Sequence, residues 1–281
     1  MKILTDTGVI SRSSILVGSS RQQALRWGKN VAYTTIAGFE RVELQKDPDQ
    51  QHEADALFTV GRLAREGKIT VCTYSELVAE IWRGSMGRDP LVNAFVGCVF
   101  QNCASAIERS KFRQTVEMGE WFAKGGMKDR DHKVQFSHFS QMPYFEWLSL
   151  LSDDQKRQIE SHASLFNLDD FELESLHDLD WYQNLTKLIP RKDDLPDCFH
   201  LWTARRNDVD VFLTLEKKLP KIVQQLRERH KNPIDFNVAV LRPTELLHRF
   251  GVAKIDPVPI DIGRFYTYAE VFQINDRLLH G

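Results

Sequence analysis

The sequence predicts an α/β protein in which a parallel sheet is flanked by helices and interrupted by a long, mostly helical insertion. Short apolar runs rich in β-branched residues alternate with segments of helical periodicity, which is the pattern of a parallel sheet. The alternation holds through residue 84 and resumes at residue 191. The aromatic-rich residues between these points show no persistent strand pattern, so we expect helices there.

The first half of the expected sheet lies in residues 1–84. Residues 2–5 form an apolar run, and we expect a buried strand that presents Asp6 at its carboxyl end. The residues from there to Ala54 show no clear periodicity and are expected to be irregular. The other expected elements are a helix over 54–64 stopped by Gly67, a strand over 69–73, and a helix from Ser75 to Trp82 followed by Gly84.

The second half of the sheet is expected in residues 191–250, which would complete one discontinuous domain with residues 1–84. Pro196 suits the first turn of a helix that contains Asp197. Pro243 breaks the last apolar run. The expected elements are a helix from 196, a strand over 209–214, a helix from 220, a strand over 236–241 and a helix over 245–250.

Residues 85–190 form the expected helical insertion, and residues 251–281 form a C-terminal extension without a predicted structure. Ser152 is placed to cap a helix before Gln155. The insertion is rich in Trp and Tyr, and we expect these side chains to lie mostly in the core. The alternative is a stacking platform for single-stranded RNA, which would need exposed rings beside basic residues.

Composition narrows the class of protein. The chain has 281 residues and a net charge of −2, and it contains no run of about 18 apolar residues, so we expect no membrane span. The four cysteines have no CxxC spacing, which favours free thiols in a reducing compartment and a cytoplasmic location. Charge is unevenly distributed, because no acid lies between Asp6 and Glu40 whereas four basic residues do. Such a segment is either a solvated surface or a flank of a site that receives phosphates.

Four acidic residues are candidates for one site. Asp6 and Glu216 each follow an expected strand, and ligand sites of parallel sheets form outside the carboxyl ends of the strands. Glu80 and Asp197 lie on the adjacent expected helices, although Glu76 shares the helix face of Glu80, so one of that pair is expected to be solvated. Clustered carboxylates need a cation to remain ionised together, and hard oxygen ligands favour Mg²⁺ or Mn²⁺. We assign Asp6, Asp197 and Glu216 as metal ligands and all four acids as catalytic.

Three stretches of the sequence resemble the PIN-domain family of metal-dependent nucleases. The stretches are Ile3-Leu4-Thr5-Asp6-Thr7, the segment 69–84 that ends Ala79-Glu80-Ile81-Trp82-Arg83-Gly84, and Asp197-x-x-His200-Leu201-x-x-Ala204 followed by Phe212-Leu213-Thr214-Leu215-Glu216. Residues 238–243 and 245–247 also resemble the family's last strand and short helix. The resemblance covers about half of the chain and implies the PIN-like Rossmann-type fold with metal-dependent ribonuclease activity, often as the toxin of a toxin–antitoxin pair.

The resemblance implies a role for each matched residue. Phosphodiester hydrolysis would occur at the four-carboxylate site, on RNA rather than DNA, with Thr214 orienting a water or a carboxylate. The chain departs from the family in having Glu rather than Asp at position 216 and in the length of residues 85–190. Both departures leave open a catalytically weak PIN-like binding or regulatory module that uses residues 85–190 to bind a protein partner. The candidate phosphate-binding residues are Arg12, Arg83, Arg205 and Arg206.

These residues also allow other interpretations. Each acid has a structural alternative: Asp6 as a strand end, Asp197 as a complement to a helix dipole, and Glu216 as a surface charge. His200 is expected to be a packed or hydrogen-bonded histidine rather than a base. A haloacid-dehalogenase-like phosphotransferase would need a second Asp two residues after Asp6, where the chain has Gly8. The sequence does not predict the nucleic-acid sequence preference or the oligomeric state.

Overall fold

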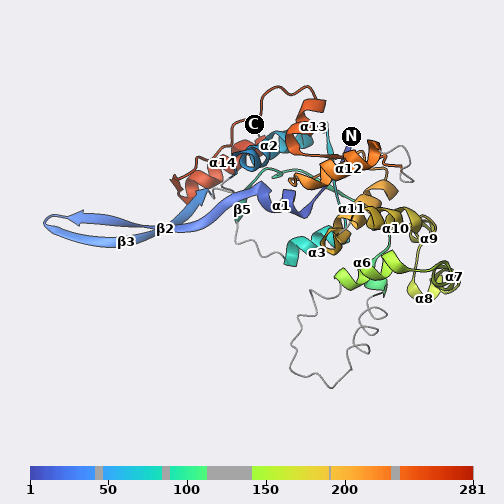
Figure 1. The fold of residues 1–281 in the computed structure, drawn as a ribbon. Coiled ribbons are helices and arrows are strands. Elements are labelled where there is room, and N and C mark those ends of the chain that lie inside the picture. Colours follow the sequence, from blue (N-terminus) through green and yellow to red (C-terminus); the bar gives the residue numbers. More distant parts are fainter. Residues whose placement is uncertain (42–46, 84–88, 113–140, 190, 229–234, 281) are drawn as a thin grey trace, which may run out of the picture.

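The protein contains a five-stranded parallel sheet and a four-stranded antiparallel sheet, with helices packed around them (Figure 1). A computed structural model provides the coordinates. The structure describes residues 1–41, 47–83, 89–112, 141–189, 191–228 and 235–280.

The parallel sheet confirms the expected α/β class. The predicted strands over 2–5, 69–73, 209–214 and 236–241 are all present, the last two shortened to Val211–Leu213 and Ala239–Leu241. A fifth strand at one edge lies inside the segment expected to be helical. In spatial order the strands are β6 (Phe100–Asn102), β4 (Thr70–Thr73), β1 (Lys2–Thr5), β7 (Val211–Leu213) and β8 (Ala239–Leu241).

The strand order identifies the place where a ligand site is expected. From β1 the chain moves outward through β4 to β6, and it then returns to the other side of β1 to form β7 and β8. This is the doubly wound order, and its direction reverses between β1 and β7. Ligands of such sheets bind outside the carboxyl ends of the strands at that reversal. In this chain those ends are followed by Asp6 and Thr214.

Both faces of the parallel sheet are buried because alternate side chains point to opposite faces. Leu4 and Phe212 belong to one apolar core, whereas their neighbours Ile3 and Val211 belong to the other. The first core is covered by α3 (Ser75–Arg83), α6 (Gln141–Leu150), α10 (Leu179–Leu188), α11 (Leu195–Arg206) and α12 (Lys218–Glu228). The second is covered by α1 (Thr7–Ser13), α2 (Pro48–Arg65), α13 (Pro243–Arg249), α14 (Tyr268–His280) and the antiparallel sheet.

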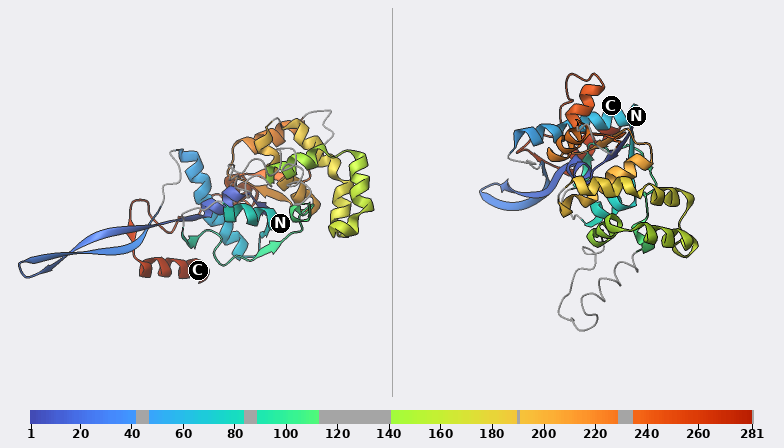
Figure 2. Two further views of the ribbon diagram at one scale, coloured as in Figure 1. Left: turned by 90° about the horizontal axis from the view of Figure 1, so that it is seen from below. Right: turned by 45° about the vertical axis from the view of Figure 1, so that its right-hand side comes forward.

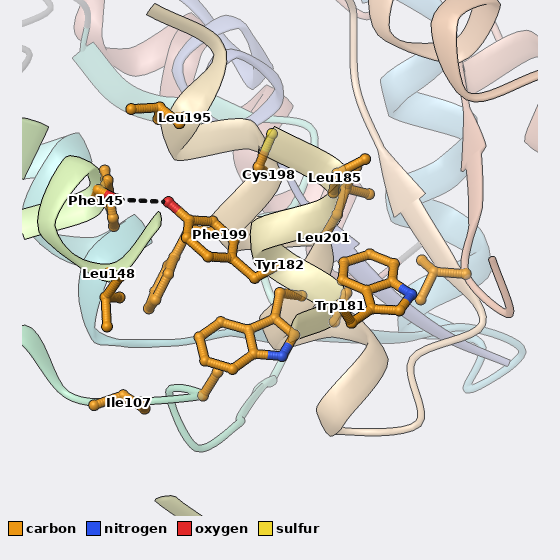
Figure 3. Packing of buried hydrophobic residues seen from close by; sticks show 14 of the residues in the cluster. Ile107, Phe145, Leu148, Trp181, Tyr182, Leu185, Leu195, Cys198, Phe199 and Leu201 are labelled. Carbon is orange, nitrogen blue, oxygen red and sulfur yellow. Dashed lines mark hydrogen bonds between the residues drawn. The ribbon is translucent and has the colours of Figure 1, made fainter. Parts of the chain in front are cut away.

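Aromatic side chains fill the first core, as expected for most of the rings in residues 85–190. The ring of Phe199 on α11 lies 4.9 Å from that of Phe145 on α6 and 5.8 Å from that of Trp202. The buried hydroxyl of Tyr182 on α10 donates a hydrogen bond to the Phe145 carbonyl, 3.0 Å away (Figure 3). Helices α6, α10 and α11 therefore form one core with the sheet. Trp121 and Phe122 lie outside the described residues.

The antiparallel sheet corrects the expectation of irregular structure before Ala54. Its long hairpin is fixed by pairs from Leu16–Arg41 to Trp27–Asn30, and it turns at Gly28, whose positive φ of 57° suits glycine. The hairpin projects far beyond the rest of the molecule (Figure 2). The strands, in spatial order, are β5 (Asp89–Asn93), β2 (Ser14–Trp27), β3 (Asn30–Arg41) and β9 (Phe265–Tyr266).

Residues 85–190 are not helical throughout. β6 extends the parallel sheet at its edge and β5 joins the antiparallel sheet, so the predicted boundary at residue 84 divides elements that belong to the same two sheets. The segment from Gln141 onward is helical, and the predicted Ser152 cap forms a capping box with Gln155. Its further helices are α7 (Asp153–Ser161), α8 (Ala163–Phe166) and α9 (Asp170–His177), and a short 3₁₀ helix (Lys192–Asp194) precedes α11.

The C-terminal extension has a defined structure: β9 pairs with β3, and α14 packs against the second core. All four cysteines are free thiols. Within the described ranges, no helix is long and apolar enough to cross a membrane.

Candidate functional site

Asp6 is positioned where β1 ends beside β7. Its backbone N–H donates to the Leu213 carbonyl at 2.9 Å, and its carboxylate caps α1 by accepting a 3.3 Å hydrogen bond from the Gly8 N–H. The fully buried Thr214 hydroxyl donates to the other Asp6 carboxylate oxygen at 2.9 Å. The same hydroxyl oxygen accepts from the Glu216 N–H at 3.1 Å. Thr214 therefore fixes the Asp6 carboxylate and the backbone of Glu216 together, at the reversal of strand order.

Glu80 is held by three side chains from distant parts of the sequence. The Thr7 hydroxyl donates to one carboxylate oxygen at 2.5 Å, and the Gln141 amide donates to the other. His200 Nε2 lies 3.4 Å from that second oxygen. Burial opposes ionisation of Glu80, but the hydrogen bond and charge of His200, with Thr7 and Gln141, outweigh it and lower the Glu80 pKa to about 2. Both oxygens of this carboxylate are thus engaged.

His200 is the buried basic partner of the acids. It is 1% exposed, and its Nδ1 makes a hydrogen bond with the Tyr74 hydroxyl. Burial opposes protonation of the ring, but the hydrogen bond to Glu80 and the negative charges of Glu80, Asp197 and Asp6 raise the His200 pKa. The expectation of a packed, hydrogen-bonded histidine is confirmed. The spacing of the motif gave no sign that this ring would pair with Glu80.

The remaining acids carry raised pKa values because the surrounding protein partly removes them from water and neighbouring acids repel them. Burial and the charge of Asp6 raise the Asp197 pKa to about 7, against the opposing charge of His200. Burial also raises the Asp6 pKa, which His200, Thr214 and Gly8 oppose. At the rim, burial and the charges of Asp6 and Asp194 raise the Glu216 pKa. Asp6, Asp197 and Glu216 therefore form an electrostatically coupled cluster.

Some predicted residues lie elsewhere. Arg205 pairs with Asp178, and Arg206 lies 3.1 Å from Glu174, so both engage α9 and the start of α10 instead of the carboxylates. Arg12 lies in the last turn of α1, the helix that begins at Asp6. Arg83 ends α3, and its side chain lies outside the described residues.

Neither acid of the Glu76–Glu80 pair is solvated, so that expectation is wrong. Glu76 is buried, and one of its carboxylate oxygens accepts a 2.6 Å hydrogen bond from Arg109. The Glu80 side chain is 17% exposed and faces Thr7 and His200 instead.

Whether the site can bind a metal ion depends on the carboxylates of Asp6, Asp197 and Glu216. In the described part of the chain, no three His, Cys, Asp or Glu side chains are grouped so that they could hold an ion. The site is therefore not a preformed cage. Its donor chemistry nevertheless suits a hard cation, because the charges of Asp6 and Glu216 raise the pKa of Asp197 and the charge of Asp6 raises that of Glu216. Mg²⁺ is commonly bound by one or two carboxylates with several waters retained, and this cluster can supply that number.

Comparisons with known proteins add no relative: no family model, no curated protein and no solved structure matches this chain.

Proposed function

We propose that this protein is a Mg²⁺- or Mn²⁺-dependent nuclease of the PIN-like type that acts on RNA rather than DNA. The observation that carries the proposal is the coupled carboxylate cluster of Asp6, Asp197 and Glu216 at the reversal of strand order. An acid whose pKa is shifted as far as that of Asp197 is typical of functional sites rather than of solvated surfaces. The PIN-like resemblance of the same residues agrees with this assignment.

The residues of the site would have three different roles in catalysis. Asp6, Asp197 and Glu216 would hold the ion, which supplies charge neutralisation and activation of water when it is bound. Thr214 fixes the orientation of Asp6, because its buried hydroxyl has a single proton and donates it to that carboxylate. Glu80 acts as a positioning residue, since its oxygens are taken by Thr7, Gln141 and His200.

The test compares the wild type with Asp6→Asn, which removes one charge and keeps the side chain's size. Without metal, the variant should melt at a higher temperature because repulsion with Asp197 and Glu216 is relieved. Mn²⁺ should raise the melting temperature of the wild type, and it should raise that of the variant much less. Cleavage of labelled single-stranded RNA should fall by orders of magnitude.

Asp276→Asn is the matched control, because this exposed aspartate lies on α14 away from the cluster. It should behave as the wild type does in every measurement. Equal stabilisation of the wild type and Asp6→Asn by Mn²⁺ would show that the cluster does not bind the ion.

A second candidate function is a PIN-like binding module with weak or no catalysis. The absence of a preformed three-ligand group among the described residues favours it. Under this alternative, the wild type binds Mn²⁺ through Asp6 but cleaves neither RNA nor DNA. The same experiment therefore separates the two functions.

A further inference from the structure

The outer part of the β2–β3 hairpin is a surface that no residue in the described part of the chain covers. We define the arm as residues 20–35, every one of which is exposed. With about 3.3 Å per residue, eight residues per strand extend roughly 25 Å from the body. Two strands alone are marginally stable in water, so an exposed ribbon of this length is expected to bind another molecule.

The charge of the arm selects an anionic partner. It contains Arg21, Arg26 and Lys29 and no acid, and no acid lies between Asp6 and Glu40. Arg21 is paired with Glu40 at 3.2 Å, near the base of the arm. Arg26 and Lys29, close to the turn, make no ion pair with any residue that the structure describes. Two cations at the tip are therefore available to phosphates.

Exposed rings accompany these cations. Trp27 is 89% exposed and Tyr33 is 72% exposed. In the strand register Trp27 is paired with Asn30 and Tyr33 with Ala24, which places the rings on opposite faces of the ribbon. Aromatic rings beside cations bind unpaired bases by stacking, whereas the bases of a duplex are already stacked.

We propose that the arm binds single-stranded nucleic acid, with Arg26 and Lys29 on phosphates and Trp27 and Tyr33 stacked on bases. A flexible single strand can contact both faces of the ribbon. The arm would bind the substrate of the proposed nuclease, so the choice of nucleic acid as the partner rests on the proposed function. The chain passes from Asp6 through α1 directly into β2, so the carboxylate cluster and the arm are joined by a short helix and the first part of β2. The arm would hold a part of the substrate distant from the cluster.

The experiment measures binding with cleavage prevented. Labelled single-stranded RNA and DNA are titrated in EDTA at several salt concentrations, using a short oligonucleotide and one several times longer. For the longer strand, Arg26→Ala/Lys29→Ala should reduce the slope of log affinity against log salt by about 1.4, since each phosphate contact contributes about 0.7. Trp27→Ala should weaken binding at least about fivefold with the salt slope unchanged. For the short oligonucleotide, the same substitutions should change the affinity and the salt slope less.

Lys254→Ala is the matched control, because this exposed lysine lies outside the arm. It should bind as the wild type does. Loss of binding in the arm variants supports the inference even if no protein cleaves RNA, whereas normal binding by those variants overturns it even if the wild type cleaves. A concentration-dependent dimer that Trp27→Ala makes monomeric, with no nucleic acid bound, also overturns the inference and assigns the arm to a second copy.

Discussion

The carboxyl group of Asp197 has a pKa of about 7, because burial opposes its ionisation and the charge of Asp6 adds to that effect. An unfolded aspartate releases its proton near pH 4. Between about pH 4 and pH 7 the folded protein therefore retains a proton that the unfolded chain has lost. The free energy of unfolding falls as pH rises through this window and is independent of Asp197 above it.

Asp197→Asn should remove this pH dependence. Between about pH 4 and pH 8 the fall in the free energy of unfolding should be smaller in the variant than in the wild type, by up to roughly 4 kcal/mol. Urea denaturation in EDTA across this range measures the difference. Asp276→Asn should follow the wild type, and an identical fall in Asp197→Asn would contradict the assigned pKa.

Thr214 provides a second prediction at the scale of one residue. Thr214→Val keeps the shape of the side chain but removes the donor to Asp6 and the acceptor for the Glu216 N–H. We expect a loss of about 1–3 kcal/mol in the free energy of unfolding, because buried polar groups lose their partners. Mn²⁺-induced stabilisation should also decrease, since Asp6 is no longer fixed. Thr214→Ser retains the hydroxyl and should preserve the Mn²⁺ effect, and the prediction fails if both variants lose it equally.

At the scale of the element, Gly38 controls the contact between β3 and β9. A Cβ atom there would overlap the Tyr266 carbonyl oxygen and the Phe265 ring. Gly38→Ala should therefore displace β9 and lower the free energy of unfolding by about 1–3 kcal/mol. Limited proteolysis should then cut earlier near the start of α14.

Gly18→Ala is the control for this prediction. Gly18 lies on the neighbouring strand β2, where an added Cβ meets no atom within 4 Å. Its effect on unfolding and on the proteolysis pattern should be small. Equal effects of the two substitutions would show that the β3–β9 contact is not the cause.

At the scale of the whole molecule, the helices between residues 141 and 189 and the parallel sheet share one apolar core. Phe199 lies at their junction, with its ring 4.9 Å from that of Phe145 and 6.2 Å from that of Tyr182. Phe199→Ala should lower the free energy of unfolding by about 3–5 kcal/mol, and Phe199→Leu should lower it less. Thermal melts followed by far-ultraviolet circular dichroism and by tryptophan fluorescence should coincide in each protein. Two separate transitions would show that the helical segment unfolds as its own domain.

Four strands of the parallel sheet can be predicted from the sequence, together with the residues next to their carboxyl ends. Strands buried on both faces appear as short apolar runs, so the sequence predicts β1, β4, β7 and β8, and helical periodicity predicts α2, α3, α11 and α12 but not α1. The four acids of the candidate site were found in the same way, because each lies beside such an element. Their roles in metal binding and catalysis remain proposals.

Only the tertiary structure shows the hairpin, the edge strand β6 and the residues that pair with the acids. The arm buries neither face, so its sequence carries no alternation of apolar and polar residues to mark it. Glu80 binds Thr7, Gln141 and His200, which lie 73, 61 and 120 residues away in sequence. Local patterns report which face of an element is buried, whereas these contacts depend on how distant elements are brought together when the chain folds.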